Sequence, residues 1–204
     1  MKANQLKCAY CRNPAVYVCI KCGAPTCELH AKESVVCPSC IRKKETKHTV
    51  KKVSSKNEKD QIRELVRQFW GEEEQLTFDI KFNVSEQPAY VAQVGNEFAG
   101  FISLSENQDS LIVVALGVRP EYQDSGIGHS LIRKAELEAR KLQKKKLLVS
   151  TSNDDLPALG FYQCLGFQIF EVVPNVIAEK HGMTLAGVGG LPIRDELRLQ
   201  KTLE

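Results

Sequence analysis

Residues 113–128 read VVALGVRPEYQDSGIG and contain the most informative structural pattern in the chain. Its first part belongs to an apolar run, residues 111–118, that predicts a strand buried on both faces. Its last part opens a helix predicted over about residues 126–141. The junction carries Gln-x-x-Gly-x-Gly, and glycines there let a ligand approach the backbone closely. Because the first N–H groups of a helix are unpaired and lie at the positive end of its dipole, this junction suits a pyrophosphate.

The sequence on either side of this stretch alternates between strand and helix patterns. Ser55 and Glu58 form a capping box at the start of a helix that Gly71 is expected to end. Gly95 and Asn96 predict a hairpin turn. Further strands are predicted at residues 48–53, 89–94, 98–104, 147–151, 167–173 and 193–199, and further helices within residues 153–165 and at 176–181. This order of elements predicts a mixed α/β fold.

A second motif lies at residues 153–167, which read NDDLPALGFYQCLGF. Together with the glycine motif it resembles the pattern of the GNAT superfamily of N-acetyltransferases, in which Asn, Ala, Phe-Tyr and Gly-Phe follow in this order. The resemblance covers about residues 47–204. It implies a GNAT-type mixed sheet flanked by helices. It also implies the direct transfer of an acetyl group from acetyl-CoA to an amine, without an acyl-enzyme.

The resemblance assigns roles to individual residues. The main chain of Leu116, Gly117 and Val118 is expected to meet the pantetheine arm and the thioester carbonyl, where an N–H group would stabilise the oxyanion. Asn153 matches a contact to the pantetheine arm. Tyr162 matches the general acid, since a phenol can protonate a departing thiolate. The diphosphate is expected to lie among Gln123, Asp124, Ser125, Gly126, Ile127 and Gly128.

Two features of the expected site leave questions open. Residues 111–118 hold no acidic side chain, although some relatives place a general base there. Candidates elsewhere, acting through water, are Glu106, Asp109 and Glu121, and a base supplied by solvent is equally compatible with the sequence. Asp124 puts a negative charge in a loop meant for an anion, which costs affinity unless its side chain points outward.

The N-terminal part of the chain carries a second kind of signal. Seven of the eight cysteines lie within the first 40 residues. In a reducing compartment such clustering indicates metal binding rather than disulfides. With one histidine they form four pairs, each enclosing two residues, and two such pairs complete a tetrahedral zinc site. The sequence therefore predicts two structural zinc ions, with the ligands Cys8, Cys11, Cys19, Cys22, Cys27, His30, Cys37 and Cys40.

The spacing of these pairs resembles a B-box-type zinc finger, a cross-braced fold in which alternate pairs share an ion. The resemblance implies one zinc ion on Cys8, Cys11, Cys27 and His30, and a second on Cys19, Cys22, Cys37 and Cys40. A sequential arrangement of the pairs stays open. Because about 40 residues cannot bury enough surface to fold unaided, the metal is expected to supply the stability. The predicted domains are a zinc module at 1–42, a charged linker at 43–47 and a GNAT domain at 48–204.

Charge and hydropathy narrow the expected partners. Residues 1–45 carry 8 Lys or Arg and 3 Asp or Glu, and seven thiolates on two Zn²⁺ ions would cancel much of that surplus, so we expect no nucleic-acid partner. No signal peptide or membrane-spanning run is visible, so we expect a cytoplasmic protein. We expect an N-acetyltransferase whose zinc module recruits a substrate or protein partner. The alternative is a zinc-finger interaction protein whose GNAT domain is a CoA-binding or inactive scaffold. The acceptor amine could belong to a protein, a peptide or a small molecule.

Overall fold

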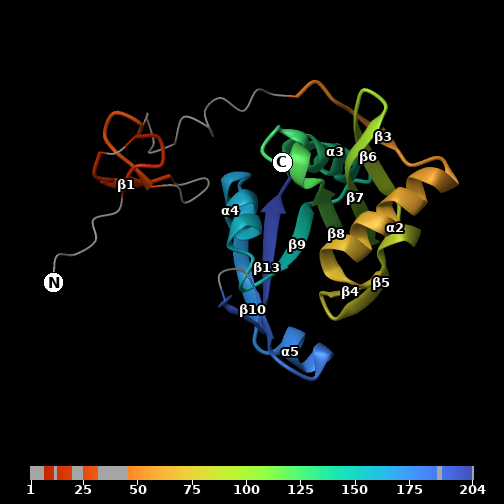
Figure 1. Ribbon diagram of the computed structural model, residues 1–204. Helices are drawn as coiled ribbons and strands as arrows, with labels where there is room; N and C mark the ends of the chain where they lie inside the picture. The colour runs from red at the N-terminus through yellow and green to blue at the C-terminus, as the bar shows by residue number, and fades with distance from the viewer. Residues whose placement is uncertain (1–6, 12, 20–24, 32–45, 188–189, 204) are drawn as a thin grey trace. The chain divides into compact units, whose positions relative to one another are not determined.

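The structure, a computed structural model, describes residues 7–11, 13–19, 25–31, 46–187 and 190–203. The chain divides into two compact units, Met1–Glu45 and Thr46–Glu204 (Figure 1). The smaller unit contains the cysteine-rich segment, and the larger unit contains the glycine motif and the second motif. None of the helices in the described ranges is long and apolar enough to cross a lipid bilayer.

The smaller unit is built from short pieces of chain. β1, Tyr17–Val18, pairs antiparallel with β2, Pro25–Thr26, and an isolated bridge joins Lys7 to Pro14. In the described part of this unit, the buried side chains belong to Cys8, Cys19, Thr26 and Cys27. Most of the buried side chains in residues 7–11, 13–19 and 25–31 can therefore bind a metal ion.

The larger unit is organised around a seven-stranded sheet (Figure 1). Its strand order is β10-β13-β9-β8-β7-β6-β3, and all neighbours are antiparallel except the parallel pair β8 and β9. This mixed sheet confirms the α/β fold predicted from the sequence. The strands are β3 (Thr49–Lys52), β6 (Ala89–Val94), β7 (Glu97–Asn107), β8 (Ser110–Val118), β9 (Lys146–Ser152), β10 (Gln168–Val173) and β13 (Glu196–Thr202).

Helices pack on both faces of this sheet. α2, Lys56–Trp70, contributes to the apolar cluster on one face, and α3, Ile127–Lys141, and α4, Leu156–Cys164, contribute to the cluster on the other. β8 belongs to both clusters, with Val113 on one side and Ile112 on the other, because successive side chains of a strand point to opposite faces. That is why β8 reads as an uninterrupted apolar run.

α2 begins and ends where the sequence predicts. The Ser55 hydroxyl accepts a hydrogen bond from the Glu58 N–H at 3.2 Å, and the Glu58 carboxylate accepts one from the Ser55 N–H at 3.1 Å. Gly71 ends the helix in the left-handed conformation, with φ 76°. An ion pair of 2.8 Å between Lys51 and Glu58 joins β3 to the start of α2. The predicted capping box and terminating glycine are confirmed.

A hairpin between α2 and β6 is absent from the sequence prediction. It consists of β4, Glu74–Thr77, and β5, Ile80–Asn83. Its turn is made by Phe78 and Asp79, which lie in the left-handed region at φ 52° and 62°. Hairpin turns of this kind usually carry glycine or asparagine. Because neither is present here, the sequence gives no local signal for the turn.

The last strand lies further along the chain than predicted. The sequence pattern places it at residues 193–199, whereas β13 runs over Glu196–Thr202. The residues before it form a separate short pair, β11 (Leu185–Ala186) with β12 (Pro192–Ile193). The apolar residue Ile193 belongs to this pair, so an apolar run alone could not locate the boundary between the two strands.

β8 and β9 run side by side over only part of their length. Their parallel pairing covers residues 110–113 of β8. Ser103 of β7 pairs with Ala115, but the next residue, Leu104, pairs with Val113, so Val114 is the extra residue of a bulge. From Val114 onward, the strand pairing of β8 in the described structure is with β7. The remaining edge of β8 is therefore open to a ligand between the two strands.

Candidate active site and metal cluster

A cavity of about 340 Å³ lies where β8 and β9 separate. Its walls come from β8 and β9, from α4, from the end of α2, from β4 and from α5, Val176–His181. The aromatic side chains in its lining are Phe69, Trp70 and Tyr162, and the titratable ones besides Tyr162 are Glu72, Asp155, Lys180, His181 and Glu196. The separation of the two strands thus creates a pocket with both apolar and acid–base side chains.

Tyr162 is a buried residue of α4 in the wall of this cavity. Its ring packs edge-on against Phe161 and Phe167, with centroid distances of 5.2 Å and 5.6 Å. Burial raises the pKa of its phenol well above the ordinary value, and the negative charge of Asp155 raises the pKa further. The phenol therefore keeps its proton at neutral pH, which is the form that a general acid requires.

The open end of β8 brings main-chain groups to the cavity. Leu116 lies in its lining. Gly117 has no room for a side chain, because a Cβ there would lie 2.9 Å from the ring of Phe101 and 3.2 Å from that of Phe69. The carbonyl of Val118 accepts a hydrogen bond from the side chain of Gln123 at 3.1 Å, which ties the strand end to the glycine motif.

The glycine motif forms a tight loop between β8 and α3. The chain enters it through a 3₁₀ turn, η2, at Pro120–Tyr122, and the Ser125 hydroxyl donates to the carbonyl of Tyr122. Gly126 precedes Ile127 at the start of α3 with φ 87°, a conformation that favours glycine. A Cβ on Gly128 would lie 3.1 Å from the ring of Phe161. No side chain hydrogen-bonds the N-cap of α3 among the described residues, so its first N–H groups can serve an anion.

Asp124 is an exposed residue of this loop. Its backbone is in the left-handed region, at φ 57°, where aspartate is tolerated better than most side chains. An exposed carboxylate is solvated, so its repulsion of a bound anion is weaker than that of a buried one. The exposure of Asp124 therefore reduces the loss of anion affinity that the sequence predicts at this position.

The carboxylates proposed as bases from the sequence lie outside the cavity lining. Glu106 pairs with Lys144 at 3.3 Å, and Asp109 lies in the turn before β8, at the end of the strand remote from the cavity. Glu121 is an exposed residue of η2. The acids in the lining are instead Glu72, Asp155 and Glu196, which come from three separate segments and share no sequence motif.

Asp155 is both the cap of α4 and a wall of the cavity. Its carboxylate accepts a hydrogen bond from the Ala158 N–H at 3.0 Å, as the sequence predicts for an N-cap. Burial raises its pKa; the N–H of Ala158 lowers it, and the neighbouring Asp154 raises it. The net upward shift makes this carboxylate a better proton acceptor than an ordinary aspartate.

The other two cavity acids are engaged by cations. Glu72 forms an ion pair with Lys180 of α5. Glu196, a buried residue of β13, pairs with Arg198 at 2.9 Å and lies 3.3 Å from the hydroxyl of Thr77. These contacts hold the acids in place: the Glu72 pair joins the segment before β4 to α5, and the Thr77 contact joins β4 to β13.

The side chain of Asn153 forms hydrogen bonds within the larger unit. Its side-chain amide donates to the carbonyl of Pro192 at 2.8 Å. Its carbonyl oxygen accepts from the N–H groups of Arg194 and Asp195 at 2.9 and 2.8 Å. These bonds tie Asn153, the residue that follows β9, to the segment before β13. Asn153 is not in the cavity lining. The amide nitrogen carries a second hydrogen, so a contact to a pantetheine arm can form without breaking these bonds.

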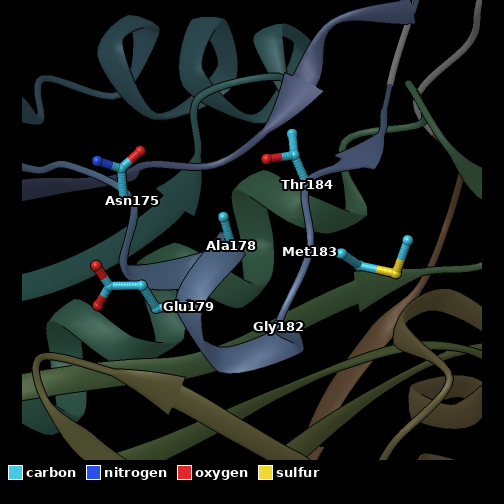
Figure 2. A pocket seen from close by; sticks show the side chains of 6 residues that line it. All are labelled: Asn175, Ala178, Glu179, Gly182, Met183 and Thr184. Carbon is cyan, nitrogen blue, oxygen red and sulfur yellow. The ribbon is translucent and has the colours of Figure 1, made fainter.

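A separate shallow depression lies on the other face of α5 (Figure 2). It is lined by Asn175, Ala178, Glu179, Gly182, Met183 and Thr184. Ile177, Lys180 and His181 line the cavity instead, as expected for two opposite faces of one helix. The depression has a single titratable side chain, Glu179, so the acid–base chemistry of this region lies on the cavity side.

Comparison with known proteins decides the family. The sequence profile of the acetyltransferase (GNAT) family matches residues 59–167, more than half of the chain. The chain belongs to this family. The GNAT protein is also 28% identical over 151 residues to the uncharacterized protein YxbD of Bacillus subtilis (strain 168), a match that covers 72% of this chain and 94% of that protein.

Solved structures share the fold of this GNAT protein. An IAA acetyltransferase from Bacillus cereus ATCC 14579 superposes with a TM-score of 0.64 at 23% identity, covering 77% of this chain and 100% of that one. A Bacillus subtilis acetyltransferase in complex with CoA gives a TM-score of 0.65 at 24% identity, covering 78% and 100%. At this level of identity the likeness establishes the fold.

The smaller unit of the GNAT protein gathers four side chains that can bind a metal ion. The ligand atoms of Cys8, Cys11, Cys27 and His30 all lie within 4.8 Å of one another. The two sulfurs of Cys11 and Cys27 are 3.6 Å apart, and His30 Nδ1 lies 3.3 Å from Cys27 Sγ and 3.7 Å from Cys8 Sγ. Zinc–ligand bonds of about 2.0–2.3 Å give a tetrahedron with edges of roughly 3.6–3.8 Å. These residues therefore fit a Cys₃His metal site.

The second predicted ligand set falls mainly outside the described residues. Cys22, Cys37 and Cys40 lie there, whereas Cys19 is described and buried. The cluster that is described joins the first Cys-x-x-Cys pair to the third pair rather than to the second. This is the grouping that the cross-braced resemblance implies for the first ion.

The environment of Cys8 favours a thiolate. Burial raises its pKa, but hydrogen bonds from the N–H groups of Tyr10, Cys27 and Cys11 outweigh this and lower the pKa to about 6. The pKa of Cys11 is raised: the N–H of Asn13 lowers it, and burial together with the neighbouring sulfurs of Cys27 and Cys8 raises it by more. Thiols crowded in this way bind a metal cation as thiolates, because the cation displaces their protons.

Proposed function

We propose that the protein is an acetyl-CoA-dependent N-acetyltransferase that transfers the acetyl group directly to an amine. The observation that carries this proposal is the separation of β8 from β9 beyond Val113, which opens a cavity beside the buried phenol of Tyr162. The glycine loop that follows β8 would supply an anion site at the N-terminus of α3. Membership in the GNAT family supports the same reaction.

The cavity and the loop would bind different parts of acetyl-CoA. The backbone of Leu116, Gly117 and Val118 would hold the pantetheine arm and polarise the thioester carbonyl, because β8 has an open edge there. The loop of Gln123, Asp124, Ser125, Gly126, Ile127 and Gly128 would hold the diphosphate through its N–H groups. Placing the thioester beside the amine accounts for a large part of the rate in such a reaction.

Two side chains would move the protons. The phenol of Tyr162, which is protonated at neutral pH, would protonate the departing thiolate. Asp155 would accept the proton of the ammonium group, directly or through water, because Glu72 and Glu196 are already paired with Lys180 and Arg198. In this assignment both acid–base groups come from α4 and its N-cap.

We propose that the smaller unit is a B-box-like module with two structural zinc ions. Cys8, Cys11, Cys27 and His30 would bind one ion, and the second set, Cys19, Cys22, Cys37 and Cys40, would bind the other. Four protein ligands leave no position for water, so such ions stabilise a fold rather than catalyse a reaction. The module would recruit the substrate or a protein partner, with its exposed apolar side chains, such as Val16 and Leu29, as contact points.

The acceptor would be a primary amine held in the cavity between Trp70 and Tyr162. Proteins of similar fold include a ribosomal-protein-S18-alanine N-acetyltransferase from Escherichia coli and an aminoglycoside 6'-N-acetyltransferase. The fold thus serves both protein and small-molecule amines, and an acceptor screen for this protein must contain both classes.

The test is acetyl transfer by the purified full-length protein. Acetyl-CoA binding is first measured by calorimetry, and transfer is then followed by the mass of each acceptor in a panel of peptides with free N-termini, lysine peptides, polyamines and aminoglycosides. Measuring the acceptor mass is preferable to detecting released CoA with a thiol reagent, because the reagent would also react with the eight cysteines of the chain. Acetylation of a panel member supports the proposal. Binding of acetyl-CoA without transfer to any amine favours a CoA-binding interaction protein instead.

A further inference from the structure

The chain enters the larger unit at Thr46, directly beside the glycine loop. The N–H of Thr46 donates to the carbonyl of Ser125 at 3.3 Å. The ring of His48 lies between two partners: Nδ1 is 2.6 Å from the carbonyl of Thr46, and Nε2 is 2.7 Å from the hydroxyl of Ser130. Residues 46–48 therefore touch both the loop and the first turns of α3.

The bond from Thr46 orients the peptide group between Ser125 and Gly126. A trans peptide is planar, and its C=O and N–H point in opposite directions. Because the carbonyl of Ser125 is turned toward Thr46, the N–H of Gly126 is held pointing away from residues 46–48. This N–H belongs to the group of free donors at the start of α3. Its direction bears on how tightly an anion is held there.

The hydrogen bonds of His48 define its protonation pattern. A carbonyl oxygen can only accept, so Nδ1 carries a proton and donates to Thr46. In the neutral ring, Nε2 then accepts from the hydroxyl of Ser130. The N–H of Ser130 donates to the carbonyl of Gly126 at 3.1 Å, within the first turn of α3. His48 thus joins the entering chain to the turn that follows the loop.

We propose that His48 is a positioning residue for the coenzyme. By holding Thr46 and Ser130 it keeps the peptide group before Gly126 and the first turn of α3 in the orientation that binds a diphosphate. This inference rests on the proposed function, since it concerns the diphosphate half of acetyl-CoA. His48 is outside the cavity lining, so it acts on coenzyme binding and not on the transfer step.

The test compares two acetyl donors with the full-length protein. Acetyl-CoA carries the diphosphate, and S-acetylpantetheine lacks it. His48→Ala should raise the KM for acetyl-CoA and the Kd for CoA about tenfold, the equivalent of one or two hydrogen bonds. The kcat, and the KM for S-acetylpantetheine, should stay at the wild-type values. His48→Gln, whose amide can still reach Ser130, should recover part of the affinity for CoA.

Two further variants separate a positioning role of His48 from a general loss of stability. Thr49→Ala changes an exposed residue one position further along and should behave as wild type. Ser130→Ala should weaken CoA binding as well, and the double variant with His48→Ala should be no weaker than His48→Ala alone, since the two side chains act through one contact.

Equal losses with both donors, or an unchanged Kd for CoA in His48→Ala, would overturn the positioning role. Additive losses in the double variant would contradict the contact with Ser130. If the wild-type protein neither binds CoA nor transfers an acetyl group, the proposed function itself fails. That result is seen in the wild-type protein, so it cannot be confused with the effect of a substitution at His48.

Discussion

The two units of this protein have interiors of different composition. In the larger unit the sheet separates two apolar clusters, in which side chains such as Phe101 and Leu131 are fully buried. In the described part of the smaller unit the buried side chains are three cysteines and a threonine, while Val16, Val18 and Leu29 remain 56%, 56% and 74% exposed. The larger unit can be stabilised by apolar burial, whereas we expect the smaller unit to depend on metal binding by its ligand set.

The difference explains why the two units show different signals in the sequence. An apolar core requires apolar residues at strand or helix spacing, and residues 111–118 and α2 have them. A metal site requires only that a few ligands recur at short spacing. The two units should therefore respond to different perturbations. Each of the following experiments tests whether a change affects one unit without the other, or packing without chemistry.

Removal of the metal should have the largest effect, and only on the smaller unit. Structural zinc contributes on the order of 10 kcal/mol to such modules, so chelation at neutral pH should unfold the predicted zinc module at 1–42 and leave the larger unit folded. Hydrogen exchange measured by mass spectrometry would show the loss of protection. Cys27→Ser should do the same, whereas Cys164→Ser is a control because that cysteine is exposed on α4.

A smaller unit that keeps its protection after the metal content has been shown to be zero would contradict this prediction. Metal analysis of the wild-type protein also tests the second ligand set, since two zinc ions per chain are expected and one would limit the module to the described cluster.

Loss of a core side chain should produce the complementary result. Leu131 of α3 is fully buried in one apolar cluster, and Leu131→Ala should lower the unfolding free energy of the larger unit by about 2–5 kcal/mol. The zinc content should not change. Leu137→Ala, at an exposed position of the same helix, is the matched control. A similar loss for both variants, measured by denaturant unfolding, would contradict the assignment of the core.

Tyr162→Phe separates packing from chemistry within the larger unit. The substitution keeps the aromatic contacts with Phe161 and Phe167 and removes only the hydroxyl. The kcat should fall about 10²-fold, with little change in the Kd for CoA or in the melting temperature. Unchanged turnover, under conditions in which the transfer step limits the rate, would remove Tyr162 from the mechanism.

Acid should weaken the larger unit through Glu58. Its ion pair with Lys51 and hydrogen bonds from the N–H groups of Ser54 and Ser55 lower its pKa from 4.5 to about 2, although burial raises it. Because the folded-state pKa is the lower one, this stability is present above pH 4.5 and is lost as the pH falls toward 2. Glu58→Gln should cost about 2 kcal/mol at neutral pH and flatten the pH dependence in that window.

Denaturant unfolding at a series of pH values would measure the effect of Glu58. Glu64→Gln, on an exposed position of the same helix, removes a carboxylate without removing the cap and serves as the control. A slope that persists in Glu58→Gln would assign the acid sensitivity to other groups.

The smallest effect is expected at Asp155. Its raised pKa, caused first by burial, should appear as the acidic limb of the kcat profile, because a general base must be deprotonated. Asp155→Asn keeps an oxygen that can cap α4 through Ala158, so the larger unit should stay folded. The kcat should fall about tenfold or more and the acidic limb should disappear. A profile with the same limb would exclude Asp155 as the base.

Local signals in the sequence predicted the helices well. The capping box of Ser55 and Glu58, the cap at Asp155 and the helix at Val176–His181 all appear where expected. Each depends on residues within one or two turns of one another. The β4–β5 hairpin was missed because Phe78 and Asp79 replace the usual turn residues, and its position is set by contacts with β13, including the one between Thr77 and Glu196.

The family, the glycine loop, the aromatic acid candidate and the ligand spacing of the metal cluster could all be predicted from the sequence, because these signals lie in continuous motifs. Long-range packing instead fixes which acids line the cavity, that the amide of Asn153 bonds to Pro192, and that His48 contacts Ser130 of α3. These features join residues far apart in the chain, as His48 and Ser130 are. Such contacts depend on how strands and helices pack, and no short stretch of sequence carries that information.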